Sequence, residues 1–313
     1  MSTKVIKVTQ ETMNQMQAHY KASLLEKVPP GGVFAAKLSS CMVTAYKSGK
    51  VMFQGGQADK EASVWESQSS EVQSKAKSTQ PKVRTDQYSV PKGIENMAII
   101  GSDEVGTGDY FGPITVVAAY VKPSHMPLLK ELGVKDSKGL KDDQIIKIAR
   151  DIRQVIPHSI LILHNEKYNN LQAKGMTQGK MKALLHNKAL AHVLDKIEPE
   201  QPDGILIDQF AEPGVYFNHV KNEKRIIKER VYFSTKAEGV HLAVAAASII
   251  ARYVFVTEFD KLSEKAGMTL QKGAGAGVDK IAAQLIKTKG EGILPEIAKV
   301  HFANTEKARK LVR

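Results

Sequence analysis

The 313-residue chain contains one cysteine, Cys41, and this scarcity excludes two kinds of site. A single thiol cannot form an intramolecular disulfide, and it cannot build a cysteine-based zinc site. Residues 1–16 lack the apolar core of a secretory signal, and no run approaches the roughly 20 apolar residues of a membrane span. These absences predict a cytoplasmic protein without a membrane partner.

Positive charge is plentiful. The chain has 45 Lys and Arg residues against 33 Asp and Glu residues, so its formal net charge is +12. With 42% hydrophobic and 25% charged residues, the composition is that of an ordinary globular protein. The charge favours a polyanionic partner, and the length is typical of about two domains.

A polar segment at residues 67–92 divides the chain. It is rich in Ser, Gln, Lys and Pro and has almost no aliphatic residues, so it predicts a flexible interdomain linker. Before it, residues 1–66 predict a small α+β binding module whose first helix begins after Thr9 and runs to Leu25. The module's other predicted elements are strands at 33–37, 42–46 and 51–54 and a helix at 59–66.

Residues 93–313 alternate between apolar strands and helices, which indicates an α/β layered domain. The predicted strands are 97–102, 114–121, 159–164 and 204–208. The predicted helices are 142–154, 177–197 and 239–260, followed beyond a glycine-rich segment by 280–287 and 294–307.

Carboxylates stand at the ends of these elements. Asp103 and Glu104 close one apolar strand, Asp208 closes another, and Glu238 heads a helix. Strand ends are where α/β sheets usually bind ligands, although Asp103 and Glu104 converge only if the strand ends or bends there. Other interpretations remain open: exposed acids in a turn, an Asp208 turn or helix cap, and a Glu238 that stabilises a helix dipole.

Oxygen ligands without cysteine or paired histidines suit Mg²⁺, with Mn²⁺ as a possible substitute. Two such ions roughly 4 Å apart activate water and stabilise the leaving oxygen in phosphodiester hydrolysis. His164, His186, His192 and His301 match no ligand spacing, so most are expected to be satisfied or exposed. A basic chain with an acidic cluster is what a metal-dependent nuclease requires.

Three motifs resemble type 2 ribonuclease H. They are residues 102–113, Asp136-Ser137-Lys138, and Lys236-Ala237-Glu238 followed by residues 245–252. Thr107, residues 109–113, Glu238 and the N-terminal module indicate the ribonuclease HIII branch. Thr107 stands where the HII branch has arginine, which questions any preference for a single embedded ribonucleotide.

This resemblance implies an RNase H-like mixed sheet flanked by helices, preceded by a TBP-like module. It also implies an endonuclease that hydrolyses the RNA strand of RNA/DNA hybrids by two-metal-ion catalysis. The metal ligands would be Asp103, Glu104, Asp208 and Glu238. The implied substrate contacts are Gly106, Thr107 and Gly108 at 2′-hydroxyls, Lys138 near the scissile region, and Tyr46, Lys47, Lys50 and Phe53 in the module.

Two rival functions remain: a DNA-strand nuclease or recombinase of the same superfold, and a non-catalytic hybrid-binding protein. Intact carboxylates at all four matched positions disfavour a pure binder, which gains nothing from acids that face phosphates. No protein partner is evident, and a monomer is expected.

Overall fold

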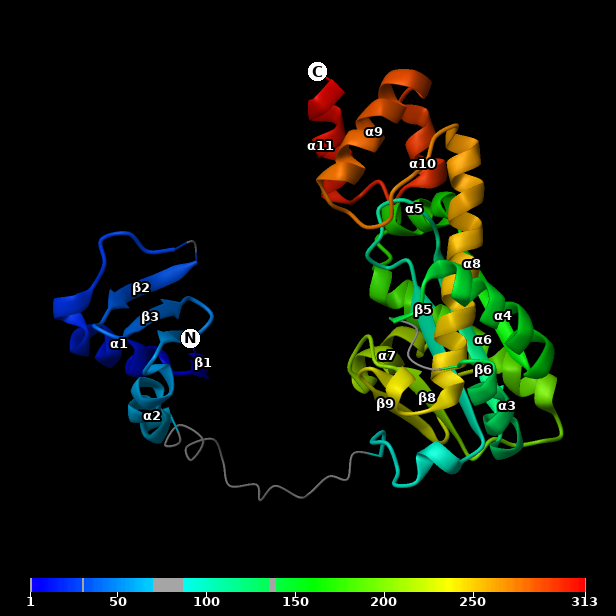
Figure 1. The fold of residues 1–313 in the computed structure, drawn as a ribbon, viewed down its shortest axis with the longest axis horizontal. Helices are drawn as coiled ribbons and strands as arrows, with labels where there is room; N and C mark the ends of the chain where they lie inside the picture. The colour runs from blue at the N-terminus through cyan, green and yellow to red at the C-terminus, as the bar shows by residue number, and fades with distance from the viewer. Residues whose placement is uncertain (1, 30, 70–86, 135–138, 313) are drawn as a thin grey trace. The chain divides into compact units, whose positions relative to one another are not determined.

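The computed structural model describes residues 2–29, 31–69, 87–134 and 139–312. The chain divides into two units, residues 1–84 and 85–313, which are described separately (Figure 1). Lys138 lies outside the described residues, as does most of the predicted linker.

The N-terminal unit is a four-stranded antiparallel sheet packed against helices. The strand order is β1-β4-β3-β2, with β1 at Ser2–Lys7, β2 at Gly32–Lys37, β3 at Cys41–Tyr46 and β4 at Lys50–Gly55. Strand β1 was not predicted. It contains few apolar residues, and its pairing with β4 makes it a strand.

Helix α1 (Gln10–His19) begins where predicted, because the Thr9 hydroxyl accepts a hydrogen bond from the Thr12 amide at 3.1 Å. It ends six residues before Leu25, and a short 3₁₀ turn follows. Helix α2 (Ala58–Ser69) is longer than predicted. Both helices contribute to the hydrophobic core of the unit, in which Phe53 is fully buried.

The second unit contains a five-stranded mixed sheet in the order β7-β6-β5-β8-β9. Strands β5, β6 and β7 are antiparallel neighbours, whereas β8 and β9 run parallel to β5. The strands are β5 (Ile99–Val105), β6 (Ile114–Val121), β7 (His158–Leu163), β8 (Gly204–Asp208) and β9 (Val231–Ser234). The four predicted strands are therefore present, and β9 was missed because only four residues form it.

Helices cover both faces of this sheet, as the α/β pattern predicted. One face packs against α3 (Met126–Glu131), α4 (Asp142–Val155) and α8 (Leu242–Ala266). The other packs against α5 (Asn165–Ala173), α6 (Gln178–Ile197) and α7 (Pro213–Val220).

Helix α8 lies very close to the sheet (Figure 1). A Cβ atom on Gly101 of β5 would stand only 2.3 Å from the Val244 backbone nitrogen, so glycine is required there. Contrary to the expectation from the sequence, α8 is long and apolar enough to cross a membrane, alone among the described helices. However, 72% of its apolar window is buried, as in the core helix of a globular domain.

The chain ends in a group of helices with their own apolar core: α9 (Ala276–Lys289), α10 (Leu294–Ile297) and α11 (Ala303–Val312). The helix predicted over 294–307 is broken at residues 298–302. There the Ala298 backbone is extended and forms an isolated bridge with Phe111. A long-range backbone contact therefore overrides local helix propensity.

The predicted linker extends too far toward the C-terminus. The Tyr88 carbonyl accepts a hydrogen bond from the Phe233 amide at 3.0 Å, and its ring packs 5.1 Å from the Phe217 ring. Tyr88 is thus part of the second unit.

Candidate active site

Two parallel strands bring the predicted carboxylates to one edge of the sheet. Ser102 of β5 pairs with Ile207 of β8, so Asp103 and Asp208 follow side by side. The Ala237 amide donates a hydrogen bond to Asp208 Oδ1 at 2.8 Å, and Glu238 is the residue after Ala237. Asp103, Asp208 and Glu238 therefore come from adjoining segments.

Asp103 lies in a strongly perturbed environment. Its residue surface is 8% exposed. Burial raises the pKa of Asp103 to about 7, and the negative charges of Asp208 and Glu104 add to the increase, against a hydrogen bond from Ser248. A buried carboxylate next to another one is the kind of donor set that a divalent cation stabilises.

Glu104 points to the opposite face of the sheet. Its carboxylate accepts hydrogen bonds from Lys182 Nζ at 2.7 Å and from His186 Nε2 at 2.9 Å, both on α6. Burial alone would raise the pKa of Glu104, but the hydrogen bonds and charges of His186 and Lys182 hold it below its usual value. This carboxylate is therefore ionised and held in place by α6.

Strand β5 keeps its regular alternation, so Asp103 and Glu104 do not converge. Asp103 meets Ser248 of α8, whereas Glu104 meets α6. In the described part of the chain, no three His, Cys, Asp or Glu side chains gather closely enough to hold a metal ion. The four-carboxylate ligand set stays a prediction, with Asp103 and Asp208 as its best-supported members.

Lys182 and His186 contact the predicted ligand Glu104, a contact that was not predicted from the sequence. Their spacing of four residues places them on one helix face, which is the available signal. His186 Nδ1 also lies 2.9 Å from the Ser102 hydroxyl, and the Phe210 ring lies 4.2 Å from Lys182 Nζ. His186 is fully buried and has polar partners on both ring nitrogens.

The other three histidines have different surroundings. His164 is exposed and lies 3.8 Å from Glu258. His192 Nδ1 lies 3.3 Å from the Ser159 hydroxyl, and the His301 ring stacks on Tyr168.

The predicted 2′-hydroxyl loop, residues 106–108, directly follows β5. Gly106 has φ +94°, and a Cβ atom there would stand 2.1 Å from the Pro113 carbonyl oxygen. Gly108 is exposed, with open space around the position of a Cβ atom. The backbone conformation therefore requires glycine at 106, whereas the surroundings of Gly108 leave room for a side chain.

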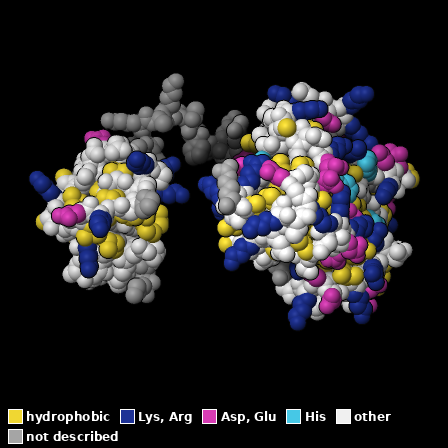
Figure 2. Space-filling model, turned by 90° about the horizontal axis from the view of Figure 1, so that it is seen from above, with side chains coloured by type: hydrophobic (Ala, Val, Ile, Leu, Met, Phe, Trp, Pro, Cys, Tyr) yellow, Lys and Arg dark blue, Asp and Glu magenta, His cyan; other side chains and the backbone are white. Residues whose placement is uncertain are grey.

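The four module residues predicted to contact substrate differ in their exposure to solvent. Lys47 and Lys50 are exposed, and Tyr46 is half-buried. Tyr46 and Lys50 line a shallow cavity of about 550 Å³ with Val5 and Met52. The prediction for Phe53 is wrong, because its side chain is 0% exposed in the core. Figure 2 shows hydrophobic side chains between Lys and Arg on one face of this unit.

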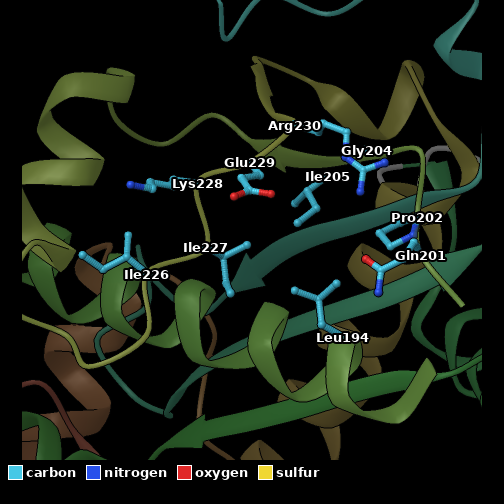
Figure 3. Close-up of a pocket in the computed structure, with 10 residues that line it drawn as sticks. All are labelled: Leu194, Gln201, Pro202, Gly204, Ile205, Ile226, Ile227, Lys228, Glu229 and Arg230. Atoms are coloured by element: carbon cyan, nitrogen blue, oxygen red, sulfur yellow. The ribbon is translucent and has the colours of Figure 1, made fainter. Parts of the chain in front are cut away.

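A separate cavity of about 170 Å³ lies at the other end of β8 (Figure 3). Gly204 and Ile205 line it, together with Leu194, Ile227 and the charged residues 228–230. Because Gly204 begins β8 and Asp208 ends it, this cavity is not part of the carboxylate site.

Comparisons with known proteins agree with this arrangement. Residues 100–305 match the family described as Ribonuclease HII, and residues 3–78 match a domain of unknown function. Ribonuclease HIII of Bacillus subtilis (strain 168) is 60% identical over 311 residues, covering 99% of this chain and 98% of the relative. Ribonuclease HIII of Bacillus pumilus is 58% identical, with 99% of each chain covered.

Solved structures give the same result. Bst-RNase HIII in complex with Mn²⁺ is 46% identical, with a TM-score of 0.70 and coverage of 100% of this chain and 99% of that one. Aquifex aeolicus RNase H3, at 20% identity and a TM-score of 0.53, shares the fold. The mixed sheet flanked by helices is thus an RNase H-like fold. With the paired carboxylates at its edge and near-complete coverage of such similar relatives, the chain belongs to the ribonuclease HIII family.

Proposed function

We propose that this protein is an endonuclease that hydrolyses the RNA strand of RNA/DNA hybrids with divalent metal ions. The observation that carries the proposal is the pair Asp103 and Asp208, placed side by side by parallel strands, with Asp103 buried and its pKa raised to about 7. Family membership gives the reaction class. A net charge of +12 suits a polyanionic substrate.

Asp103, Asp208 and Glu238 would hold the metal ions. Glu104, the fourth member of the predicted ligand set, faces α6, where Lys182 and His186 bond to its carboxylate. Two bound Mg²⁺ ions, or Mn²⁺ as in the related Bst structure, would supply Lewis acidity and an activated water. Lys182 and His186 hold the Glu104 carboxylate ionised before any metal binds.

Substrate recognition is divided between the two units. The exposed backbone at Gly108 suits contact with a 2′-hydroxyl, which distinguishes RNA from DNA. Gly106, Thr107 and Lys138 complete the proposed contacts in the catalytic domain. Exposed Lys47 and Lys50, beside Tyr46, suit contact with phosphates and sugars in the N-terminal module. We further infer a cytoplasmic monomer.

The test is incubation with Mg²⁺ and labelled RNA/DNA, DNA/DNA and RNA/RNA duplexes. We expect cleavage of the RNA strand of the hybrid alone, and a nearly complete loss of turnover in Asp103→Asn. The exposed Asp151→Asn is the matched control and should cleave at the wild-type rate. Cleavage of DNA/DNA would favour the DNA-strand nuclease, and hybrid binding without cleavage would favour the binding protein. Full activity of Asp103→Asn would refute the site assignment.

A further inference from the structure

The carbonyl oxygens of the 2′-hydroxyl loop and the turn after it are held from inside the protein. Gln178 Nε2 donates to the Thr107 carbonyl at 3.1 Å. Lys299 Nζ donates to the Asp109 carbonyl at 2.8 Å and to the Gly112 carbonyl at 2.6 Å. These donors lie 71 to 190 residues away in the sequence, at the start of α6 and between α10 and α11.

Lys299 is an unusual side chain to find in a protein interior. It is 0% exposed, and its ammonium group donates hydrogen bonds to two backbone carbonyls. Burial lowers the pKa of Lys299 to about 7, against a smaller opposing effect of the Asp109 carboxylate. Burying an ammonium group is costly unless its hydrogen bonds are well made. The hydrogen bonds from the Lys299 ammonium group therefore hold the turn 109–112 in one conformation.

The direction of the held carbonyls determines the direction of the loop amides. A trans peptide is planar, with its C=O and N–H pointing to opposite sides. The Thr107 carbonyl points inward to Gln178, so the Gly108 amide in the same peptide unit points outward. Gly108 is exposed, and nothing stands within 4 Å of the position of its Cβ. The amide is thereby presented to a ligand.

The two donors are connected through one buried residue. Gln178 Nε2 also donates to the Tyr168 hydroxyl at 3.1 Å, and Lys299 Nζ lies 5.8 Å from the Tyr168 ring. Asn165 supports the same turn by donating to the Gly112 carbonyl at 3.0 Å. We propose that Gln178 and Lys299 are positioning residues: Gln178 orients the Thr107–Gly108 peptide, and Lys299 fixes the adjoining turn 109–112, so that the Gly108 amide recognises a substrate 2′-hydroxyl. This role rests on the proposed function of the loop.

The experiment compares two duplexes that differ only at the 2′ position: an RNA/DNA hybrid and the same duplex with 2′-fluoro nucleotides in the RNA strand. The variants are Gln178→Met and Lys299→Met, which remove the donors at similar volume, with exposed Lys287→Met as the control. We expect both variants to lower kcat/KM on the hybrid by about tenfold to a hundredfold. The ratio of kcat/KM on the hybrid to kcat/KM on the 2′-fluoro duplex should fall toward one. This ratio does not depend on the fraction of the protein that is folded.

The outcomes separate the positioning role of Gln178 and Lys299 from the proposed 2′-hydroxyl contact of the loop. Wild-type rate ratios in both variants would overturn the positioning role, while leaving the loop function intact. Equal cleavage of both duplexes by the unaltered protein would overturn the loop function, and the positioning role with it. If Lys299→Met does not fold, Gln178→Met decides alone, because it removes only neutral hydrogen bonds, those to the Thr107 carbonyl and the Tyr168 hydroxyl.

Discussion

At the scale of single residues, the folded structure disfavours the ionised form of the Asp103 carboxyl group. Burial raises its pKa to about 7 in the folded chain, against an ordinary value of 3.8, so the folded state binds this proton more tightly than the unfolded state does. The sign of the effect follows: the ionised carboxylate destabilises the fold, and stability falls as pH rises from about 4 to about 7. A bound cation would remove this penalty.

Asp103→Asn should therefore raise thermal stability when divalent cations are absent. At pH 8 we expect a gain of about 1–4 kcal/mol, because the amide carries no charge. The gain should shrink at pH 4.5, where the folded wild-type carboxyl is already protonated. Thermal unfolding in EDTA at both pH values measures it, with Asp151→Asn as the control. An identical gain at both pH values would show that charge is not its cause.

Glu104 and Lys182 form an ion pair in which both side chains are about one-tenth exposed. Lys182→Met removes one of the two α6 side chains that stabilise the buried Glu104 charge and leaves only His186 of the pair, so it should destabilise the protein by up to about 3–5 kcal/mol. Lys188→Met, at an exposed position on the same helix, should change stability little.

A double-mutant cycle with Glu104→Gln, followed by urea unfolding, measures the coupling between the two side chains. We expect an interaction of about 1–3 kcal/mol. Additive effects of the two substitutions would mean that the pair does not hold Glu104.

At the scale of elements, β5 carries Asp103 and Glu104 near its carboxyl end, and the chain turns at Gly106, directly after the strand. The parallel pairing with β8 ends at Ser102, while the antiparallel pairing with β6 continues to Val105. Asp103 and Glu104 therefore lie where β5 still pairs with β6 but no longer with β8. This is the carboxyl end of the parallel strands, where α/β sheets usually bind ligands.

The two glycines of the loop should respond differently to substitution. Gly106→Ala should lower stability by about 1–3 kcal/mol, because φ is +94° and the new Cβ would collide with the Pro113 carbonyl. Gly108→Val should leave stability nearly unchanged and lower hybrid cleavage, because the side chain would obstruct close approach of the substrate. Thermal unfolding and kcat/KM separate the two effects. Normal cleavage by folded Gly108→Val would exclude this loop from recognition.

At the scale of the whole molecule, each unit has its own hydrophobic core. All four predicted carboxylates belong to the second unit. We therefore propose that the N-terminal module contributes affinity and effective concentration rather than chemistry.

Residues 85–313 should therefore keep turnover once substrate is bound, but with a higher KM. The fragment starts at 85 because Tyr88 packs into the second unit. Each lost phosphate contact should flatten the log–log salt dependence of binding by roughly 0.7–0.9. The full-length variant Lys47→Met/Lys50→Met should show part of this change, whereas Lys60→Met on α2 should show none. Equal affinity and equal salt slope of the fragment would assign the module another role.

Elements with local signals could be predicted from the amino-acid sequence alone. Apolar runs ending in Asp103 and Asp208, the Thr9 cap and the motif wording required no knowledge of distant residues, and they led to the fold and the family. The tertiary structure was needed to identify the edge strands β1 and β9, since β1 has few apolar residues, β9 has only four residues, and both depend on pairing with a neighbouring strand. It also placed Asp103 and Glu104 on opposite faces, and it buried Phe53. The reason is that these features depend on contacts between residues far apart in the sequence. For example, Lys182, Gln178 and Lys299 bond to partners 71 to 190 residues away, and no local sequence pattern records such contacts.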